Sequence, residues 1–482
     1  MSKFNWIRTE KTLNISGHEA YEMKSKEKLV TQVLTSLFNE DKFYGDNSET
    51  LVQTVREVIK EDPRFVANLC IYARKEMHLR SISHVLIGEL ARFQSGKAYV
   101  RRAMNKSIER VDDMTEILSY YINTYGKPIP NSMKKGLSDR LSTFDEYQLA
   151  KYNRDGSVKI KDIMCIVHPK AKDEKQNDMY KRLLEGKLET PITWETQLSA
   201  RGNSKEVWEE LIENKNLGYM AMLRNLRNII KANVSNINKV YEFLAEKHNV
   251  EKSKLLPFRY YSAYKMLMRE GIGTSRIFDT LETAIKHSTA NIEKLLGKTL
   301  ISADVSGSMN CPISKKSNMT CAEIAVLMMA LANYICEETI TTTFDTNIYM
   351  SNLSTSNGII ANANSIRVQG GGTDISLSIR YLLRNKIFVD RIIILSDNEI
   401  NRGYRVVCQK YVDEYRRKIN PEVWIHAIDM QGYGTQQFSG NKVNLIAGWS
   451  EKTLDFINKV EQGRDNLVSK IENYYFSENF IS

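Results

Sequence analysis

Hydrophobic residues recur every three or four positions along the first part of the chain. Leu29 and Val33 begin one such stripe, and Leu51 and Val55 begin another. This spacing places the apolar side chains of each segment on one face of a helix. Segments of about 12 to 17 residues with this pattern continue to about Leu296, and none reads as a strand. The pattern predicts a stack of helical hairpins, an α-solenoid in which each pair of helices buries its apolar face against the next.

One helix start is especially clear. Asp62 precedes Pro63, and an Asp side chain caps free backbone N–H groups while proline suits the first helical position. The segment that follows, from Arg64 to Met77, is apolar on one face and leads to a second amphipathic run ending at Phe93. We therefore expect two consecutive helices here.

The periodicity changes after Leu296. Short apolar runs now alternate with helical segments, and this alternation predicts a mostly parallel sheet with helices on both faces. Ligands of such sheets bind beyond the carboxyl ends of the strands, where Asp304 and Asp397 fall. The expected strands are 299–305, 339–344, 347–351, 391–396, 423–430 and 442–448, and the expected helices are 321–336, 375–385, 404–419 and 451–475.

The length of 482 residues is more than one hydrophobic core normally serves. We therefore expect a helical domain over residues 1–297 and an α/β domain over residues 298–482. The six cysteines form no CxxC pair, which favours reduced thiols over a zinc module. The first ten residues have no apolar signal core, and the longest apolar run is shorter than the ~18 residues of a membrane span. These features predict a cytoplasmic protein without a membrane partner.

The basic residues are concentrated in the helical part. The net charge is +10, yet residues 301–482 contain 18 Lys and Arg against 19 Asp and Glu. The first 300 residues therefore hold the whole excess, +11. A basic surface is typical of nucleic-acid-binding proteins, but a well-solvated helical domain has the same composition.

One break between the predicted helices is dense in cations. Lys and Arg side chains neutralise phosphates, and a tyrosine ring offers a face on which any base can stack. This combination favours RNA binding, and a solvated loop is the alternative. The cations are Lys151, Arg154, Lys159, Lys161, Lys170 and Lys172, and Tyr147 and Tyr152 lie among them.

Oxygen ligands gather at three points of the α/β part. Asp304, Ser306 and Ser308 follow the first buried strand at alternate positions, Thr373 follows three glycines, and Asp397 follows another buried strand. Carboxylates and hydroxyls are the ligands that hard divalent cations prefer. The three segments resemble the metal-ion-dependent adhesion site of von Willebrand factor A domains, which combines an Asp-x-Ser-x-Ser loop with a Thr and an Asp.

That resemblance implies a role for each residue. Ser306, Ser308 and Thr373 would contact the cation directly, while Asp304 and Asp397 would often act through water. Mg²⁺ is the expected cation and Mn²⁺ the alternative. Von Willebrand factor A domains leave one coordination position to an acidic residue of a partner protein. The resemblance therefore implies a docking point and not a catalytic centre.

Catalytic chemistry has little support in the sequence. The run Gly297-Lys298-Thr299 is like the end of a phosphate-binding loop, but Ile292 stands where the other glycine is needed. His426 lies within a strand pattern, which favours a core or edge residue over a general base. No histidine lies near a candidate nucleophile motif, so no Ser-His-Asp arrangement can be argued. We expect no enzymatic activity.

Short motifs extend along almost the whole chain. They are Tyr72–Glu76, Leu79–Ser81, Lys151-Tyr152 with Arg154, His168–Lys170, Ser204–Trp208, Leu223–Leu226, Leu256–Phe258, Asp304–Asn310 and Ser396–Glu399. Together they resemble the TROVE module of Ro 60 kDa autoantigen proteins and their bacterial and phage relatives. The resemblance implies a ring of HEAT-like helical pairs closed by a von Willebrand factor A domain.

The same resemblance implies that small noncoding Y RNAs bind on the outer surface. It also implies that single-stranded 3′ ends of misfolded RNAs enter a central hole. The interval from Lys151-Tyr152 to Arg154 is one residue shorter than in animal relatives. Arg224 and Arg227 share a helix face that would line the hole, with a solvated stripe as the alternative. The candidate RNA ligands are Lys151, Tyr152, Arg154, His168, Lys170, Lys172, Arg224 and Arg227.

Two hypotheses follow. In the first, the chain is a monomeric, non-catalytic RNA-binding protein that scaffolds a Y-like RNA in a ribonucleoprotein and takes part in RNA quality control. In the second, it is a docking scaffold that grips an acidic residue of a partner protein through its cation and has no physiological RNA ligand. The two are compatible, because the metal face could recruit a ribonuclease while the helical part holds RNA.

Overall fold

The computed structural model describes residues 11–13, 19–22, 24–34, 48–153, 156–189, 191–255, 257–289, 294–312, 319–397, 408–431, 435–447, 451–461 and 467–474. The chain divides into two compact units. Residues 24–196 and 466–482 form one, here called the helical unit, and residues 1–23 and 197–465 form the other, here called the sheet unit. The domain boundary predicted after residue 297 therefore falls inside the sheet unit.

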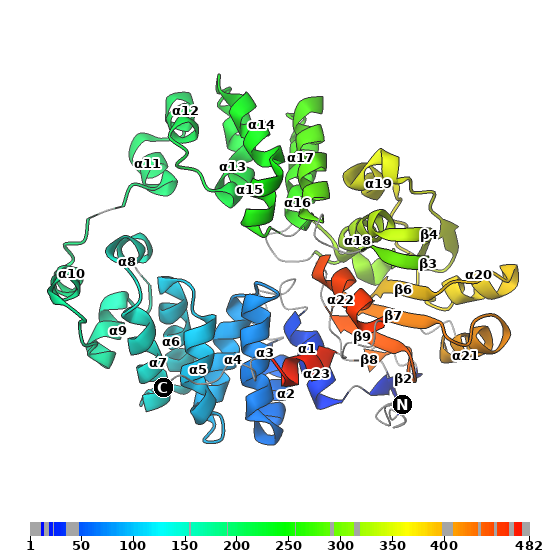
Figure 1. The fold of residues 1–482 in the computed structure, drawn as a ribbon, viewed down its shortest axis with the longest axis horizontal. Helices are drawn as coiled ribbons and strands as arrows, with labels where there is room; N and C mark the ends of the chain where they lie inside the picture. Colours follow the sequence, from blue (N-terminus) through cyan, green and yellow to red (C-terminus); the bar gives the residue numbers. More distant parts are fainter. Residues whose placement is uncertain are drawn as a thin grey trace. The chain divides into compact units, whose positions relative to one another are not determined.

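Over residues 25–185 the helical unit is built from helices stacked in chain order, drawn in blue to blue-green in Figure 1, and its last helix, drawn in red, packs against the start of this stack. Each helix contacts the next one or the next but one, so that the apolar stripes of neighbouring pairs meet. The predicted stack of helical hairpins is confirmed. Its helices are α1 (Ser25–Leu34), α2 (Ser48–Glu61), α3 (Pro63–Lys75), α4 (Ser81–Arg92), α5 (Lys97–Ser107), α6 (Val111–Tyr125), α7 (Asn131–Leu141), α8 (Glu146–Tyr152), α9 (Ile160–Val167), α10 (Glu174–Glu185) and α23 (Leu467–Glu472).

The predicted start of α3 is also confirmed. The Oδ1 atom of Asp62 accepts a hydrogen bond from the backbone N–H of Phe65 at 3.0 Å, and Pro63 occupies the first helical position. Phe65 itself is fully buried between helices. The cap therefore fixes where the chain turns from α2 into α3.

The sheet unit begins with a second set of helices. α11 (Trp194–Arg201) spans the division between the two units. The carboxylate of Glu282, on α17, accepts hydrogen bonds from the backbone N–H groups of Ile359 and Ile360 at 2.5 and 2.9 Å. This contact joins the helices to the following α/β part. The remaining helices of the set are α12 (Lys205–Glu213), α13 (Tyr219–Lys231), α14 (Ile237–Ala245), α15 (Lys247–Ser253), α16 (Pro257–Glu270) and α17 (Ser275–Ser288).

A six-stranded sheet forms the core of the α/β part (Figure 1), in the order β5-β4-β3-β6-β7-β9. All neighbours run parallel except β5, which is antiparallel to β4. Helices cover the sheet as predicted. The elements are β3 (Leu295–Asp304), α18 (Cys321–Ile335), β4 (Cys336–Phe344), β5 (Ile348–Met350), α19 (Ile359–Ser365), α20 (Leu377–Asn385), β6 (Arg391–Ser396), α21 (Cys408–Lys418), β7 (Trp424–Asp429), β9 (Val443–Ala447) and α22 (Glu451–Glu461).

Alternating side chains explain why the strands read as continuous apolar runs. Ile392 and Ile394 of β6 pack in one cluster with Ile379 of α20 and Val412 of α21. The intervening residue Ile393 is equally buried and belongs to the opposite face of the sheet. A strand covered on both faces needs apolar residues at every position.

Several elements differ from the sequence-based expectation. Strands β1 (Lys11–Leu13) and β2 (Glu19–Glu22) occur where none was expected, and β2 pairs with β8 (Thr435–Gln436). They are too short to show a period, and β8, the second partner of β2, is distant in sequence. Helix α19 was also missed. The helix expected over 451–475 is two helices, α22 and α23, and they belong to different units.

Contacts distant in sequence place α23 in the helical unit. The hydroxyl of Tyr474, which follows α23, donates a hydrogen bond to Glu76 at 2.7 Å. Lys26 of α1 reaches Glu472 at 2.7 Å and Asp62 at 2.7 Å. A helical period alone does not identify these partners, so the division of residues 451–475 between the two units cannot be predicted from that period.

His426 is a core residue, as its strand pattern predicted. It is fully buried in β7, and its Nε2 atom lies 2.8 Å from the carboxylate of Glu461 on α22. Arg391 also binds Glu461 through two hydrogen bonds of 2.7 Å. Burial lowers the pKa of His426, although Glu461 opposes this shift. This group of side chains joins α22 to the sheet.

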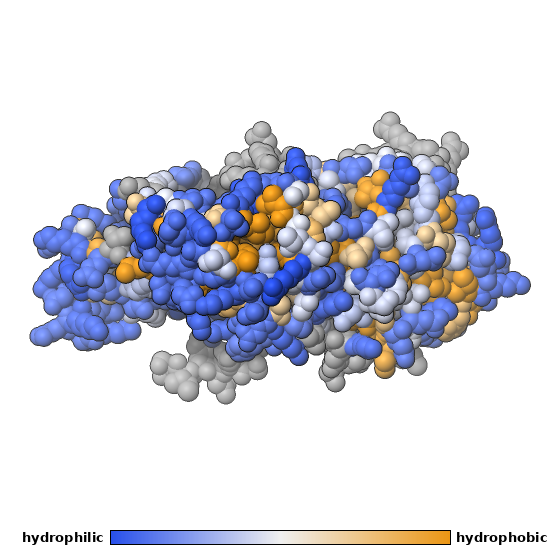
Figure 2. All heavy atoms as spheres, turned by 90° about the horizontal axis from the view of Figure 1, so that it is seen from above, coloured by the Kyte–Doolittle hydropathy of each residue, from blue (hydrophilic) through white to orange (hydrophobic). Residues whose placement is uncertain are grey.

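The surface visible in Figure 2 is mainly hydrophilic, and hydrophobic residues are scattered over it in separate patches. No helix in the described part of the chain is both long and apolar enough to span a bilayer.

Candidate functional site

The Asp304 loop lies at the carboxyl edge of the sheet. Asp304 ends β3 and is fully buried, and its Oδ1 atom accepts a hydrogen bond from the backbone N–H of Ser306 at 2.9 Å. The hydroxyls of Ser306 and Ser308 are 3.2 Å apart, and Ser308 is exposed. The loop therefore turns back on its own carboxylate and directs hydroxyl oxygens to one point.

The glycine-rich loop binds directly to the Asp304 loop. The backbone N–H of Gly307 donates to the carbonyl of Gly371 at 2.7 Å, and the N–H of Gly370 donates to Val305 at 2.8 Å. Gly370 has a φ of +90°, a conformation that residues with a Cβ rarely adopt. These bonds place Thr373, which is buried, in the loop next to the Asp304 loop.

Asp397 follows β6, the strand beside β3. The hydroxyl of Ser396 donates to the Oδ2 atom of Asp304 at 2.6 Å, and Asp397 is fully buried next to it. Burial and the neighbouring charge of Asp397 raise the pKa of Asp304 to about 7. Two buried carboxylates that disfavour each other's ionisation suit a divalent cation, which would stabilise both charged forms.

The donor set at this edge fits a hard cation. The described residues contain no group of three or more His, Cys, Asp and Glu side chains that could hold a metal by themselves. Hydroxyls from Ser306, Ser308 and Thr373 would therefore have to join Asp304 and Asp397 as ligands. Such an all-oxygen set suits Mg²⁺ or Mn²⁺ with water completing the coordination.

Two further carboxylates at this edge were not selected from the sequence. Asp345 follows β4 and Asp429 ends β7, and both are buried. Asp345 accepts a hydrogen bond from the N–H of Asn347 at 2.8 Å, and Asp429 accepts one from the N–H of Gln431 at 2.9 Å. Each stands at the end of a predicted strand, and that position is the only sequence signal that could have indicated them.

The cation-rich segment forms part of the helical unit. We call the residues Tyr147, Lys151, Tyr152, His168, Lys170 and Lys172 the α8–α9 surface. The ammonium group of Lys151 lies over the rings of Tyr147 and Tyr152, at 5.7 and 5.8 Å from their centroids. Tyr147 is 51% exposed, and His168, Lys170 and Lys172 are exposed beyond α9. His168 follows α9 as its C-terminal cap, with a φ of 44°.

The other predicted RNA ligands are not all part of this surface. Arg154 lies outside the described residues. Arg224 and Arg227 lie on α13, in the sheet unit, and Arg227 forms an ion pair with Glu270 at 3.1 Å. Arg224 is exposed. Five of the eight predicted residues, those between positions 151 and 172, belong to the helical unit, in the segment from α8 to the start of α10.

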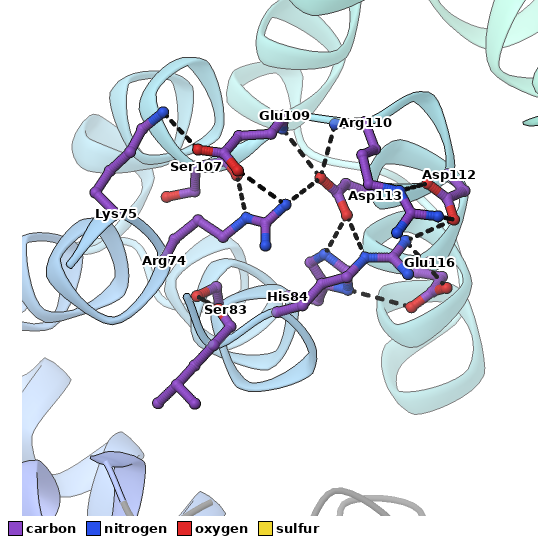
Figure 3. Close-up of polar contacts among 12 residues, drawn as sticks. Arg74, Lys75, Ser83, His84, Ser107, Glu109, Arg110, Asp112, Asp113 and Glu116 are labelled. Atoms are coloured by element: carbon purple, nitrogen blue, oxygen red, sulfur yellow. Dashed lines mark hydrogen bonds and ion pairs between the residues drawn. The ribbon is translucent and has the colours of Figure 1, made fainter. Parts of the chain in front are cut away.

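A buried ion network supports α6, the helix against which α8 and α9 pack (Figure 3). Asp113, near the start of α6, is fully buried. Its carboxylate contacts Arg74 at 3.2 Å, Arg80 at 2.5 Å and His84 at 3.2 Å. Burial acts to raise the pKa of Asp113, but His84 and the two arginines outweigh it and hold the pKa far below the usual range of Asp.

The motifs around Arg74 and Arg80 thus have a structural role. These arginines come from α3 and the start of α4, and they converge on a carboxylate of α6 that is also bonded to the N–H groups of Glu109 and Arg110. Sequence reasoning did not select Asp113, because its partners come from separate helices.

Family comparisons agree with this architecture. The TROVE domain model matches residues 19–186 and 180–296, and the Ro60 vWA domain model matches residues 298–459. The chain belongs to the TROVE-domain family. Members of this family bind RNA.

Three known proteins illustrate the relationship of this TROVE-domain chain to others. It is 25% identical to telomerase protein component 1 of Rattus norvegicus over 294 residues and 24% identical to that of Mus musculus over 289 residues. These alignments cover 43% and 42% of the chain, but only 11% of each relative, so it spans about a tenth of their length.

The fold also matches the crystal structure of the Deinococcus radiodurans RO (RSR) protein. The TM-score is 0.61, and the match covers 85% of this chain and 93% of that one at 16% identity. At this identity the likeness concerns the fold alone.

Proposed function

We propose that this chain is a non-catalytic RNA-binding protein that holds a small noncoding, Y-like RNA on the α8–α9 surface and forms a ribonucleoprotein for RNA quality control. One observation supports this proposal most strongly. Lys151 is half-buried beside the exposed ring of Tyr147, Lys170 and Lys172 are exposed, and none of the three lysines forms an ion pair with a described carboxylate. The positive charge is therefore available to phosphates.

Three lysines of this surface have no ion-pair partner in the described part of the chain. Among the described residues, no ion pair involves the side chains of Lys151, Lys170 or Lys172. By contrast, Arg182 of α10 is held by Glu146 at 2.6 Å. An ammonium group without a carboxylate partner breaks no ion pair when it binds a phosphate. Its contact with the phosphate therefore adds more to the binding free energy.

The tyrosine rings offer a second kind of RNA contact, the stacking of bases. Tyr147 exposes half of its surface next to Lys151, and a base stacked on such a ring contributes about 1–3 kcal/mol. Stacking and phosphate contacts together suit unpaired nucleotides, whose bases are accessible. We therefore extend the proposal to single-stranded 3′ ends of misfolded RNAs, for which exposed Arg224 is a further candidate ligand.

Zero-length ultraviolet crosslinking tests this proposal. We expect a short uridine-rich single-stranded RNA to crosslink to the full-length chain on the peptides that carry Tyr147, Tyr152 and His168, as identified by mass spectrometry. Excess unlabelled single-stranded RNA should reduce these adducts more than blunt duplex RNA does. Adducts confined to residues 298–459, or none at all, would contradict the proposal.

A second function has support of its own, namely cation-dependent docking of a protein at the carboxyl edge of the sheet. The buried pair Asp304 and Asp397, with hydroxyls directed to the same point, supports it. A bound Mg²⁺ or Mn²⁺ would supply a positive centre for an acidic side chain of a partner, such as a ribonuclease. This function is compatible with RNA binding, because it uses different residues.

Removal of one hydroxyl tests the cation site. We expect Thr373→Ala to weaken Mn²⁺ binding about tenfold or more, since a lost ligand to a charged centre costs about 1.5–3 kcal/mol. Isothermal titration calorimetry measures the change, and Thr355→Ala, in a short helical turn of the same α/β part, is the matched control. Equal Mn²⁺ affinity in the wild type and Thr373→Ala would exclude Thr373 as a ligand.

A further inference from the structure

Two cysteines face each other just after the Asp304 loop. The sulfur atoms of Cys311 and Cys321 are 3.3 Å apart, and no disulfide joins them. The backbone brings them together as well. Pro312 and Thr320 form an antiparallel bridge, and the N–H of Cys321 donates to the carbonyl of Cys311 at 3.1 Å.

This backbone geometry is compatible with a covalent link. Opposed residues in an antiparallel pair have Cα atoms about 4.5–5.5 Å apart. Disulfides span Cα separations of about 4.4–6.8 Å, so the sulfurs can reach a bond length of about 2.05 Å with little backbone movement.

The two thiols differ in their access to solvent. Cys311 is partly exposed, whereas Cys321, the first residue of α18, is 2% exposed. The amide of Gln431 donates to the sulfur of Cys311 at 2.9 Å and to the carbonyl of Ser308 at 3.4 Å. A small oxidant can therefore reach Cys311 first, while Cys321 lies directly behind it.

We propose that Cys311 and Cys321 are a modification site, at which a hydroperoxide forms a reversible intramolecular disulfide. The thiolate of Cys311 attacks the peroxide and breaks its O–O bond, which yields a sulfenic acid and one water from hydrogen peroxide. The Cys321 sulfur then attacks the sulfenic sulfur, the S–S bond forms and a second water leaves. Two thiols are oxidised and one peroxide is reduced to two waters, and a dithiol reductant reverses the reaction.

The other cysteines lack this arrangement. Cys70, Cys336 and Cys408 are buried, and burial raises the pKa of Cys70 to about 12 and that of Cys336 to about 11, which keeps these thiols protonated. Cys165 is exposed on α9. Among the cysteines that the structure describes, Cys311 and Cys321 are the pair with sulfurs in contact.

The disulfide would connect the metal loop to a core helix. Cys311 follows Ser308 by three residues, and Cys321 begins α18, whose capping box is formed by Thr320 and Glu323. Gln431 contacts both the sulfur of Cys311 and the loop carbonyl of Ser308. Formation of the disulfide would therefore change contacts directly beside the proposed cation site.

The test uses the full-length Cys165→Ser variant, which removes the exposed thiol and leaves five. After treatment with hydrogen peroxide and alkylation, we expect loss of two of these five thiols. Non-reducing peptide mass spectrometry should show Cys311 linked to Cys321, and dithiothreitol should restore both thiols. A further Cys311→Ser change should abolish the link and leave Cys321 alkylated.

Two results would overturn the proposal. One is that Cys311 and Cys321 both remain alkylatable after peroxide treatment. The other is that Cys311 proceeds to sulfinic acid without forming a link. Because the decisive measurement is made without any change at Cys311 or Cys321, it does not depend on the folding of the Cys311→Ser variant.

Discussion

Replacing Asp113 with Asn lowers the free energy of opening of α3, α4 and α6 by about 1–3 kcal/mol. The carboxylate is fully buried and neutralises Arg74 and Arg80, while it also contacts His84. Asn keeps the shape of the side chain but removes the charge. Arg74 then keeps Glu109, and Arg80 keeps Asp112 and Glu116, as carboxylate partners, but both guanidinium groups lose the fully buried carboxylate that they share. The N–H groups of Glu109 and Arg110 also lose a charged acceptor, so the change costs more than one lost hydrogen bond.

Hydrogen exchange measured by mass spectrometry follows this change helix by helix. The matched control is Asp178→Asn on α10, where the partner Lys181 and Asp178 itself are both about two thirds exposed. An exposed pair contributes at most about 0.5 kcal/mol, so exchange should barely change in the control. Similar exchange in α3, α4 and α6 of Asp113→Asn and wild type would show that the network is not a source of stability.

The stability that Asp113 contributes decreases as the pH falls. The pKa of Asp113 in the folded chain is lowered, so its contribution is complete above the unfolded value of about 3.9 and is lost as the pH falls below it toward the folded value. The wild type therefore loses more of its stability than Asp113→Asn between about pH 5 and pH 3.

Removing two cations from the α8–α9 surface weakens RNA binding about 100-fold. In Lys151→Ala combined with Lys170→Ala, two ammonium groups without carboxylate partners are lost. A charged hydrogen bond to phosphate contributes about 1.5–3 kcal/mol, so each lysine accounts for about tenfold or more in affinity. Filter binding with the single-stranded RNA measures the dissociation constant.

The control removes the same charge from the same unit. Lys181 and Lys187 are exposed lysines that form ion pairs with Asp178 and Glu185. Lys181→Ala combined with Lys187→Ala should change the RNA affinity by less than about threefold. The charges of these two lysines are already compensated by their ion pairs, and they act on the RNA only through the screened electrostatic field of the whole protein. An equal loss in both double variants would show that net charge, and not the α8–α9 surface, determines binding.

The elements of the sheet were predictable because each is a local pattern. A strand buried on both faces is a continuous apolar run, and Asp304 and Asp397 directly follow two such runs. The topology of parallel sheets then brings these positions to one edge. Thr373 could be predicted as a site residue because it follows three glycines, which allow its loop to approach the Asp304 loop closely. That these residues bind a cation remains a prediction.

What the sequence did not reveal depends on partners distant along the chain. Asp113 has ordinary neighbours in sequence, and its importance comes from arginines on two other helices. The segment after residue 466 has a helical period, but nothing in that period shows that Tyr474 binds Glu76 of the helical unit. The meeting of Cys311 with Cys321 depends on the bridge between Pro312 and Thr320.

The salt dependence of RNA binding tests most directly whether the α8–α9 surface holds phosphates. For single-stranded RNA, the logarithm of the binding constant falls with the logarithm of the salt concentration by about 0.7 for each phosphate contact. The slope for Lys151→Ala combined with Lys170→Ala should therefore be shallower than that of the wild type by about 1.4. An unchanged slope, with or without a change in affinity, would show that these lysines do not contact phosphates and would contradict the account.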